Sequence, residues 1–512
     1  MENFVTAITN INDAINGFVW VRIGLVLLLG TGLITTVITK CFQITHLRHW
    51  WGRTIGSVFS KDTHKKLGKQ SGSVSQFQAL CTALAATIGT GNIAGVSAAI
   101  CIGGPGAVFW MWIAAFLGMM TNFSENILGI YFRHKNSEGE WSGGAMYYLK
   151  DGLGSYKGCR QIGAFLAGLF SVFAILASFG IGNMGQINKI TLNLKSAFFS
   201  NISATEIAGV SFVNWAIGFC LMIIGGFVII GGLQRIAAFA EKVVPFMAVA
   251  YIVGALIIMF IHIGSIGAMI ASIFKFAFGI KAAAGGAAGV AISQVITQGC
   301  KRGVFSNEAG LGSSVMVHSN SNVKEPVKQG LWGIFEVFAD TMVVCTMTAI
   351  VVLSSGAIDL TTGLVKEGTD DATLVAQAFG NIFGKPGEWF VAIAVLLFAF
   401  TTVLGWSHYG SKAVEYLFGV KGARVYRIIF VLMMISGAIM TSSLAWDISD
   451  TFNGLMMIPN LIGVLSLTPL VVKLTNNYVE RRIHGKDDVE PMLSYDPDIQ
   501  KKYAPLVKAG EE

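Results

Sequence analysis

The chain has 512 residues, of which 53% are hydrophobic and only 13% are charged, with a formal net charge of +7. A soluble globular chain carries roughly 25% charged residues, so this composition excludes a mainly soluble protein and indicates a polytopic membrane protein. The seven cysteines are scattered and form no CxxC pair, so we interpret them as small apolar fillers.

Apolar segments of about 20 residues are long enough to cross a bilayer. The sequence predicts eleven of them, at 21–42, 75–101, 105–131, 161–190, 206–230, 240–263, 281–301, 329–355, 388–410, 423–444 and 449–473. The first is long enough to span, which argues against a removable signal peptide. The apolar stretch 266–279, with Lys275 as its lone charge, predicts a short helix at the outer surface.

Lys and Arg residues concentrate in alternating loops, which sets the predicted orientation. They gather in 40–69, 133–160, 235–242, 301–328, 412–427 and the tail from Lys473, while loop 356–386 is acidic. The sequence therefore predicts a multi-pass membrane protein with the N-terminus outside and the C-terminus in the cytoplasm.

Two glycine-rich spans start two groups of five spans that run in opposite directions across the membrane. The predicted organisation is an outer N-terminus, first span and basic loop (1–74), a first repeat (75–263), a second repeat (264–476) and a polar cytoplasmic tail (477–512). Broken helices at matching places in inverted repeats indicate the binding site of a secondary transporter. The predicted fold class is an all-α membrane protein with two discontinuous helices.

The two breaks are predicted at Gly89–Asn92 and within Gly285–Gly289. Backbone groups in lipid must be paired, so an unwound segment is tolerated only where it lines a cavity. Freed amides suit a carboxylate and freed carbonyls suit Na⁺. The alternative is that these glycines only permit close helix packing.

Several motifs show a resemblance that covers the chain from Phe77 to about Asn476. They are "TGNIAGV", "GGPGAVFWMW", "SFGIGNMGQ", "AAAGGAAG", "RGVFSNEAGLGSS" and "FAFTTVLGWSHYG". Together they resemble the alanine or glycine:cation symporter family of prokaryotes, which implies a place in a prokaryotic cell (inner) membrane. The resemblance implies eleven spans, the last ten in a LeuT-type 5+5 inverted-repeat fold, and Na⁺-coupled uptake of alanine and glycine, with H⁺ coupling as an alternative.

The resemblance also implies a substrate site built from four spans. Backbone amides around Thr90, Gly91 and Asn92 would hold the carboxylate, Asn183 and Gln186 would share one helix face, and Trp406 would close the pocket. The full expected set is Thr90, Gly91, Asn92, Ile181, Asn183, Gln186, Gly286, Ala287, Ala291, Ser293 and Trp406.

One Na⁺ is expected between the first broken helix and the third span of the second repeat. The resemblance implies carbonyl groups near Ala85, Ile88 and Phe398 and the hydroxyls of Thr401 and Thr402 as its ligands. The alternative is that these hydroxyls only bond back to carbonyls of their own helix. No other cofactor is expected.

The chain departs from the family pattern at Ala287 and Ser293, where many members carry larger residues. Smaller walls would enlarge the pocket, so we also consider serine or glutamine as substrates.

Ionisable residues inside spans are functional candidates. Glu125, Glu336 and Asp340 are predicted near the cytoplasmic side, where an inner gate would pair them with Lys301, Arg302 or Arg133. Static ion pairs are an equal alternative, and a proton-coupling role for Asp340 is a third.

The motif "FSNEAGLGSS" repeats a pattern from the first break, since Asn307–Gly310 resembles Asn92–Gly95. A second break at 304–308 would put Lys301 and Arg302 inside the membrane, at a cost of about 2.5–3.5 kcal/mol each. We therefore expect the break near Gly285–Gly289 and place "SNEAG" in the inner loop.

The remaining function classes find little support in the sequence. A channel usually needs a symmetric ring, a membrane enzyme needs clustered catalytic groups, and a receptor needs an output domain. We expect no enzymatic activity, no nucleic-acid partner and a monomer, because one chain contains the whole site.

Overall fold

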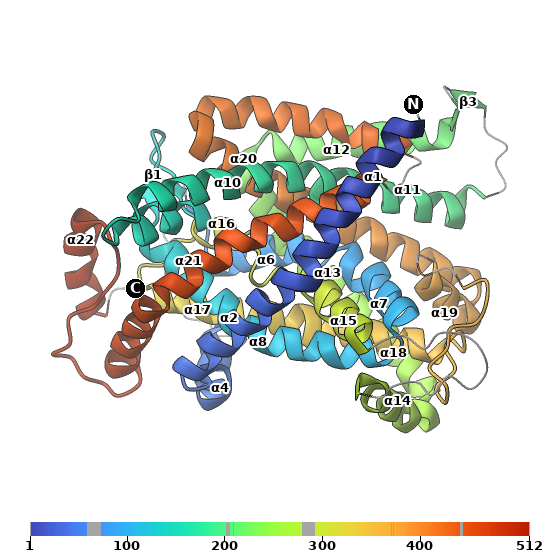
Figure 1. The fold of residues 1–512 in the computed structure, drawn as a ribbon, viewed down its shortest axis with the longest axis horizontal. Coiled ribbons are helices and arrows are strands. Elements are labelled where there is room, and N and C mark those ends of the chain that lie inside the picture. The colour runs from blue at the N-terminus through green and yellow to red at the C-terminus, as the bar shows by residue number, and fades with distance from the viewer. Residues whose placement is uncertain are drawn as a thin grey trace.

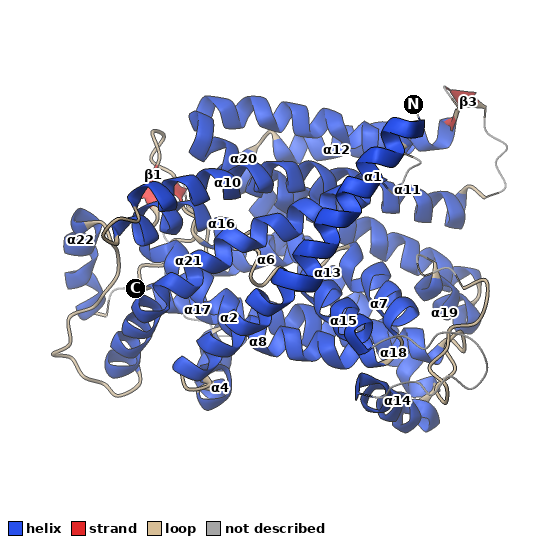
Figure 2. Cartoon of the chain, in the orientation of Figure 1, coloured by secondary structure: helices blue, strands red, loops and turns tan. Residues whose placement is uncertain are grey.

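The computed structural model describes residues 2–58, 73–200, 205–207, 209–278, 292–369, 371, 373–440 and 444–510. This part of the chain is mostly helical (Figure 2), and its strands are two short antiparallel hairpins. One pairs β1 (His134–Lys135) with β2 (Trp141–Ser142), and the other pairs β3 (Glu206–Ile207) with β4 (Val210–Ser211).

The helices of the first half begin with a long N-terminal element and then a broken one. In chain order they are α1 (Glu2–Gly17), η1 (Phe18–Gly24), α2 (Leu25–Ile38), α3 (Phe42–Thr45), α4 (Leu47–Arg53), α5 (Ile55–Val58), α6 (Gln76–Thr87), η2 (Gly91–Gly95), α7 (Val96–Gly103), α8 (Gly106–Tyr131), α9 (Ala145–Tyr147), η3 (Tyr148–Gly152), η4 (Leu153–Ser155), α10 (Arg160–Phe179), η5 (Gly180–Met184), α11 (Gly185–Phe198), α12 (Phe212–Ile229) and α13 (Gly232–Ile261).

The second half contains the longest helices of the chain. They are η6 (Ile263–Ser265), α14 (Ile266–Phe278), α15 (Ile292–Asn307), α16 (Val315–His318), α17 (Pro326–Val337), η7 (Phe338–Cys345), α18 (Thr346–Ser354), α19 (Leu374–Phe383), α20 (Lys385–Ile439), α21 (Leu444–Arg482) and α22 (Pro497–Lys508).

Eight helices in the described part are long and apolar enough to cross a membrane, or nine if the bent pair Gln76–Thr87 and Gly91–Gly103 counts as one span. The predicted count of eleven differs partly because the single element α20 covers two predicted spans, 388–410 and 423–444. Its backbone is interrupted at Gly419, where φ is 74°. A left-handed φ is open to glycine without a steric cost, so the chain can turn there.

The helices form two packed groups around the broken element. α8 packs against α17, α15 and α2, whereas α20 packs against α10, α11 and α12. α6 contacts α13 and α20, and η2 contacts α15, so the first break lies where these groups meet. Most long helices run along the long axis of the molecule (Figure 1).

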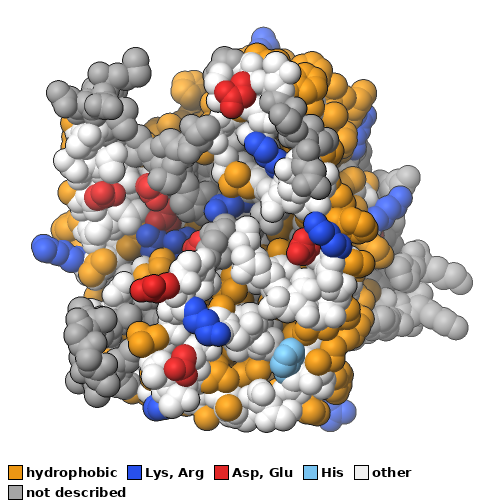
Figure 3. Space-filling model, turned by 90° about the vertical axis from the view of Figure 1, so that its right-hand side faces the viewer, with side chains coloured by type: hydrophobic (Ala, Val, Ile, Leu, Met, Phe, Trp, Pro, Cys, Tyr) orange, Lys and Arg blue, Asp and Glu red, His pale blue; other side chains and the backbone are white. Residues whose placement is uncertain are grey.

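The two ends of the molecule carry different segments. α1 begins towards the end that also carries β3 and α19, while the β1–β2 hairpin and α22 lie towards the other end (Figure 1). Viewed from the end that carries α19, charged side chains are scattered over a largely polar face, with hydrophobic side chains towards its edges (Figure 3). Large exposed hydrophobic residues instead occur along the spans, as at Phe165, Phe227 and Phe246.

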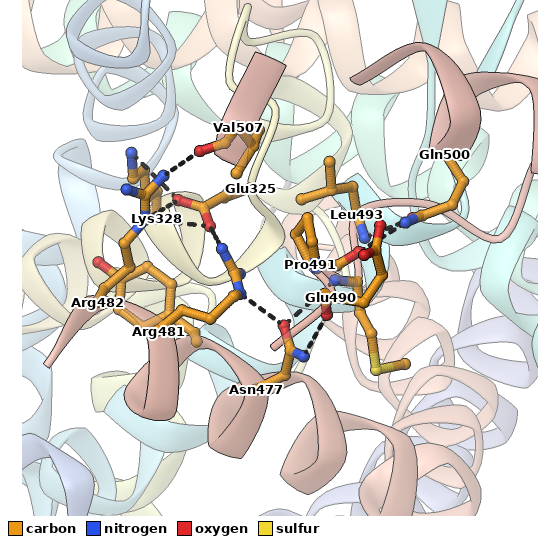
Figure 4. A network of polar contacts seen from close by, with 12 residues as sticks. Glu325, Lys328, Asn477, Arg481, Arg482, Glu490, Pro491, Leu493, Gln500 and Val507 are labelled. Atoms are coloured by element: carbon orange, nitrogen blue, oxygen red, sulfur yellow. Dashed lines mark hydrogen bonds and ion pairs between the residues drawn. The ribbon is translucent and has the colours of Figure 1, made fainter. Parts of the chain in front are cut away.

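The C-terminal segment is folded against the helical body of the protein, although its composition predicted a polar tail in solvent. Figure 4 shows Glu325 between Arg481 and Arg482 of α21, at 2.6 and 3.1 Å, while Gln500 of α22 accepts a hydrogen bond from the Leu493 amide. Leu493, Ala504 and Val507 form a small buried cluster. The tail is rich in charged residues, so its composition gave no sign of these few apolar contacts.

One buried ion pair ties three distant helices together. Lys301 of α15 pairs with Asp450 of α21 and donates to Asn16 of α1 at 3.2 Å. Removing one partner of a buried pair leaves an uncompensated charge, which costs about 3–5 kcal/mol.

We therefore expect Lys301→Met to lower the melting temperature of the purified protein in detergent by several degrees. The double variant Lys301→Met/Asp450→Leu should recover most of this loss, and Lys385→Met, at an exposed position, serves as the control. An unchanged melting temperature in Lys301→Met would contradict this account of the ion pair.

Candidate functional site

The first irregular segment follows α6. The helix starts with a capping box, in which Ser75 accepts from the Gln78 amide and Gln78 accepts from Ser75. It ends at Thr87, and the chain resumes as η2 at Gly91 after a bend of 54°. The unwound residues are buried, as an interruption in a bilayer requires.

Side chains satisfy the amides that this interruption frees. The Gly89 amide donates to Asn92 Oδ1 at 2.9 Å, and the Thr90 amide donates to Gln186 Oε1 at 3.3 Å. Thr90 Oγ1 is buried without a hydrogen-bond partner. The segment therefore presents amides that currently bind neutral amide oxygens, and an unpaired hydroxyl beside them.

The second irregular segment lies at "SNEAGLGSS". α15 ends at Asn307, Glu308 has a φ of +56°, and helical structure resumes only at Val315. Every residue from 303 to 321 is buried. The segment "SNEAG" thus leads into turns, as expected for a loop, but these turns are buried inside the protein. The resemblance between Asn307–Gly310 and Asn92–Gly95 was the sequence signal for this second irregular segment.

Gly285–Gly289, where the sequence predicted the break, lies outside the described residues, as do Gly286, Ala287 and Ala291. Ser293 is described and lies exposed in the first turn of α15. Since α15 rises by about 1.5 Å per residue, Ser293 is far from the end of that helix at Asn307. The structure does not bring Ser293 to the site.

Asp340 connects the two irregular segments. Asn92 donates to Asp340 Oδ1 at 2.7 Å, and Ser306 and Thr341 each donate to Oδ2 at 2.8 Å. Asn307 in turn donates to Thr341 Oγ1 at 2.9 Å. Asp340 belongs to η7, a π-helical stretch, and such wide turns are frequent at functional sites.

The closeness of the segments explains two of the glycines. A Cβ on Gly91 would lie 3.0 Å from Phe305 Cδ1 and 3.3 Å from Ser306 Cα, and a Cβ on Gly89 would lie 2.4 Å from Thr402 Oγ1. Each glycine therefore permits contact with a different neighbouring element.

A cluster of carbonyl and hydroxyl oxygens lies beside Gly89. Thr402 donates to the carbonyls of Ala85 at 3.2 Å and Phe398 at 3.0 Å, and Thr401 donates to Phe398 at 2.9 Å. Ile88, the residue that caps α6, is also buried. Thr401 faces Met247 Sδ at 3.7 Å as well, so it points partly towards α13.

Asn183 and Gln186 do not share a face as predicted. Gln186 reaches the Thr90 amide, whereas Asn183 donates to the Phe430 carbonyl at 2.7 Å. The wide turn of η5 (Gly180–Met184) changes the register on which the three-residue spacing depends. Ile181 and Trp406 are buried, and a Cβ on Gly182 would lie 2.4 Å from Trp406 Cβ.

The predicted gate residues have other partners. Glu125 accepts from Asn460 and from the Gly310 amide, and Glu336 accepts from His318 at 2.9 Å. Arg133 donates to the carbonyls of Ser319, Ser321 and Val323. The predicted pairs of carboxylates with Lys301, Arg302 or Arg133 are thus not among the described contacts, because α15 carries Lys301 to α1 and α21 instead.

Arg302 also conflicts with its predicted side. It lines a cavity of about 60 Å³ with Thr90, Phe305, Lys189 and Asp371, and Asp371 belongs to the loop that the charge pattern placed outside. Arg302 therefore lies beside the loop that the charge pattern placed outside, and not in an inner loop.

The architecture and the buried break together define a helical membrane transporter, and comparisons with known proteins agree. The solved structure of MhsT in complex with L-phenylalanine matches with a TM-score of 0.52 at 13% identity, over 80% of this chain and 99% of that one. This likeness shows the fold.

The chain belongs to the sodium:alanine symporter family, whose model matches residues 5–492. It is 42% identical over 470 residues to the sodium/alanine symporter AgcS of Methanococcus maripaludis, covering 92% of this chain and 97% of that protein. It is 36% identical to the probable sodium/glutamine symporter GlnT of Bacillus subtilis, with 93% and 91% covered. The family consists of transporters, so the chain is not an enzyme.

The contact at Gly91 gives a test of the site. We expect Gly91→Leu to reduce uptake of labelled amino acid by about 100-fold or more, because displacing Phe305 and Ser306 misplaces the site. Gly168→Leu is the matched control, since a Cβ there meets nothing within 4 Å.

Uptake by both variants is measured in proteoliposomes after their melting temperatures have been compared with that of the wild type. Near-normal transport by Gly91→Leu would place the site elsewhere.

Proposed function

We propose that this chain is a secondary active symporter that couples inward Na⁺ movement to uptake of a small neutral amino acid by alternating access. The observation that carries the proposal is the meeting of two irregular segments at Asp340, beside an oxygen cluster at Gly89. Family membership supports Na⁺-coupled amino-acid symport.

The oxygen cluster suits the cation. Carbonyls released at the end of a half-helix are ligands for Na⁺ in transporters with broken helices. The Thr402 hydroxyl already lies within hydrogen-bonding distance of the Ala85 and Phe398 carbonyls. A Na⁺ ion among these oxygens could therefore take the place of the hydroxyl hydrogen as the positive partner that the two carbonyls share. Ile88 and Thr401 complete the proposed set.

The unwound amides suit the substrate carboxylate. We assign its binding to the amides of Thr90 and Gly91, with Gln186 turning aside from the Thr90 amide when substrate arrives. Asn92 and Ser306 are held in place through Asp340, while Trp406 closes one wall.

Alanine and glycine are the first candidate substrates, and serine or glutamine the second. Among the relatives, AgcS is named a sodium/alanine symporter and GlnT a probable sodium/glutamine symporter. Ser293 gives no support for a wider pocket, because it is exposed. Competition of labelled alanine uptake by serine, threonine and glutamine separates the two ranges.

Proton coupling remains an alternative to Na⁺. A relative from Bacillus subtilis at 33% identity is named a putative sodium/proton-dependent alanine carrier.

The proposal also includes an outside N-terminus, a cytoplasmic C-terminus and a monomer. Cysteine labelling from each side of the membrane would test the orientation, and light scattering would test the oligomeric state.

The deciding experiment is uptake of labelled alanine into proteoliposomes with and without an inward Na⁺ gradient. Accumulation that requires the gradient supports the proposal. Equal equilibration under both conditions would contradict coupling to Na⁺.

The two threonines are predicted to differ. Thr402→Val removes an oxygen that faces Ala85, so the Na⁺ concentration for half-maximal uptake should rise about tenfold, equivalent to about 1.4 kcal/mol. Thr401→Val should have a smaller effect, since Thr401 also faces Met247. Equal Na⁺ dependence in Thr402→Val and the wild type would remove Thr402 from the site.

A further inference from the structure

Three fully buried polar side chains form a chain of contacts away from the substrate segment. His318 ends α16, and Gln329 and Glu336 lie on α17. All three side chains are 0% exposed. His318 Nε2 lies 2.9 Å from Glu336 Oε2, and His318 Nδ1 lies 2.5 Å from Gln329 Nε2.

The hydrogen positions in this triad follow from what each atom can donate. If Gln329 Nε2 donates to Nδ1, then Nδ1 carries no hydrogen, Nε2–H donates to Glu336, and the imidazole is neutral. In that arrangement Gln329 Oε1 and Glu336 Oε1 have no hydrogen-bond partner, although both are buried. The triad then contains an anionic carboxylate with one oxygen unsatisfied.

The surroundings do not neutralise this carboxylate. Besides His318, the ionisable groups that interact electrostatically with Glu336 include Glu125 of α8, Asp340 of η7, Tyr409 of α20 and Glu308 of the second irregular segment, and none of these four is basic. From α8, Asn122 donates to Glu336 at 3.2 Å. A buried charge is costly without a counter-charge.

Two basic side chains beside the triad are held by other groups. Arg133 donates to the carbonyls of the segment that follows His318, and Lys328, beside Gln329 in the chain, pairs with Glu325 at 3.2 Å. Among the ion pairs of the described residues, His318 is therefore the basic group that faces Glu336.

We propose that His318, Glu336 and Gln329 form a binding site for one proton that is carried with the substrate. The proton comes from water and bonds to His318 Nδ1, giving an imidazolium that donates to Glu336 through Nε2. The Gln329 amide turns over, so that its unpartnered Oε1 accepts from Nδ1. No bond breaks in the protein, and the carboxylate gains its counter-ion.

The position of the triad links the proton to transport, and this step rests on the proposed symport function. His318 directly follows the second irregular segment, so any movement of α16 relative to α17 and α8 stretches the triad. Asn320, two residues after His318, lines a cavity of about 150 Å³ together with His408 and Lys412. This cavity offers water a route towards His318.

The test measures proton and alanine movement together in proteoliposomes that contain a pH-sensitive dye, at a fixed Na⁺ gradient. The wild type should acidify the lumen when alanine is added, and its uptake should vary with pH between about 5 and 8. His318→Gln preserves a donor to Glu336 but binds no proton, so it should transport alanine without acidification and with a flat pH profile.

His49→Gln is the control variant, because His49 is a partly buried histidine that contacts Tyr478 at 3.1 Å outside the triad. It should keep the wild-type acidification and pH profile.

A second test variant, Gln329→Leu, keeps His318 and Glu336 and removes the acceptor for Nδ1–H. It should move the pH midpoint of uptake down by about one unit.

Three outcomes would overturn the inference. They are alanine uptake by the wild type without proton movement, unchanged acidification in His318→Gln, and an unchanged midpoint in Gln329→Leu. A purely structural contact would change the amount of folded protein without moving either readout. If alanine does not enter at any pH, the proposed function fails rather than the proton site.

Discussion

A bilayer leaves no water to bond a bare backbone group, and this constraint shapes the centre of the molecule. The two irregular segments free amides and carbonyls in a buried region. Asn92 and Gln186 accept from amides of the first segment, and Asn307 accepts from the Ala309 amide in the second. The buried polar side chains near the breaks are therefore a consequence of breaking the helices.

Asp340 links the hydrogen bonds of the first irregular segment to those of the second. It accepts from Asn92 on one segment and from Ser306 on the other. A shift of either segment changes the hydrogen bonds available to its counterpart, which is the physical basis that we propose for coupling cation and substrate. The oxygen cluster at Thr402 contacts the same turn at Gly89, so a cation there would act on the first segment directly.

The spans and the transporter class could be predicted because they depend on long-range averages of hydrophobicity and on recognisable motifs. The first interruption was also visible, since "GTGN" places glycines and an amide side chain in an apolar run. The second was assigned elsewhere because a break at 304–308 would have placed Lys301 and Arg302 inside the membrane at a high cost. Asp450 and Asn16, which receive Lys301, are far away in sequence.

Side-chain directions were the least predictable feature. Asn183 and Gln186 diverge because a π-helical turn replaces the regular helix, and no residue type marks such a turn. The carboxylates predicted for the gate likewise contact Asn460 and His318, whose positions follow from tertiary packing. Pairings of this kind depend on which helices meet, and a single sequence does not contain that information directly.

The central claim is that the two irregular segments form one site. A double-mutant cycle on Asn92→Ala and Ser306→Ala, read out as the affinity of purified protein for labelled alanine in Na⁺, tests it most directly. Our account predicts that the loss in the double variant is clearly smaller than the combined losses of the single variants, because both residues act through Asp340. Strictly additive losses would contradict it.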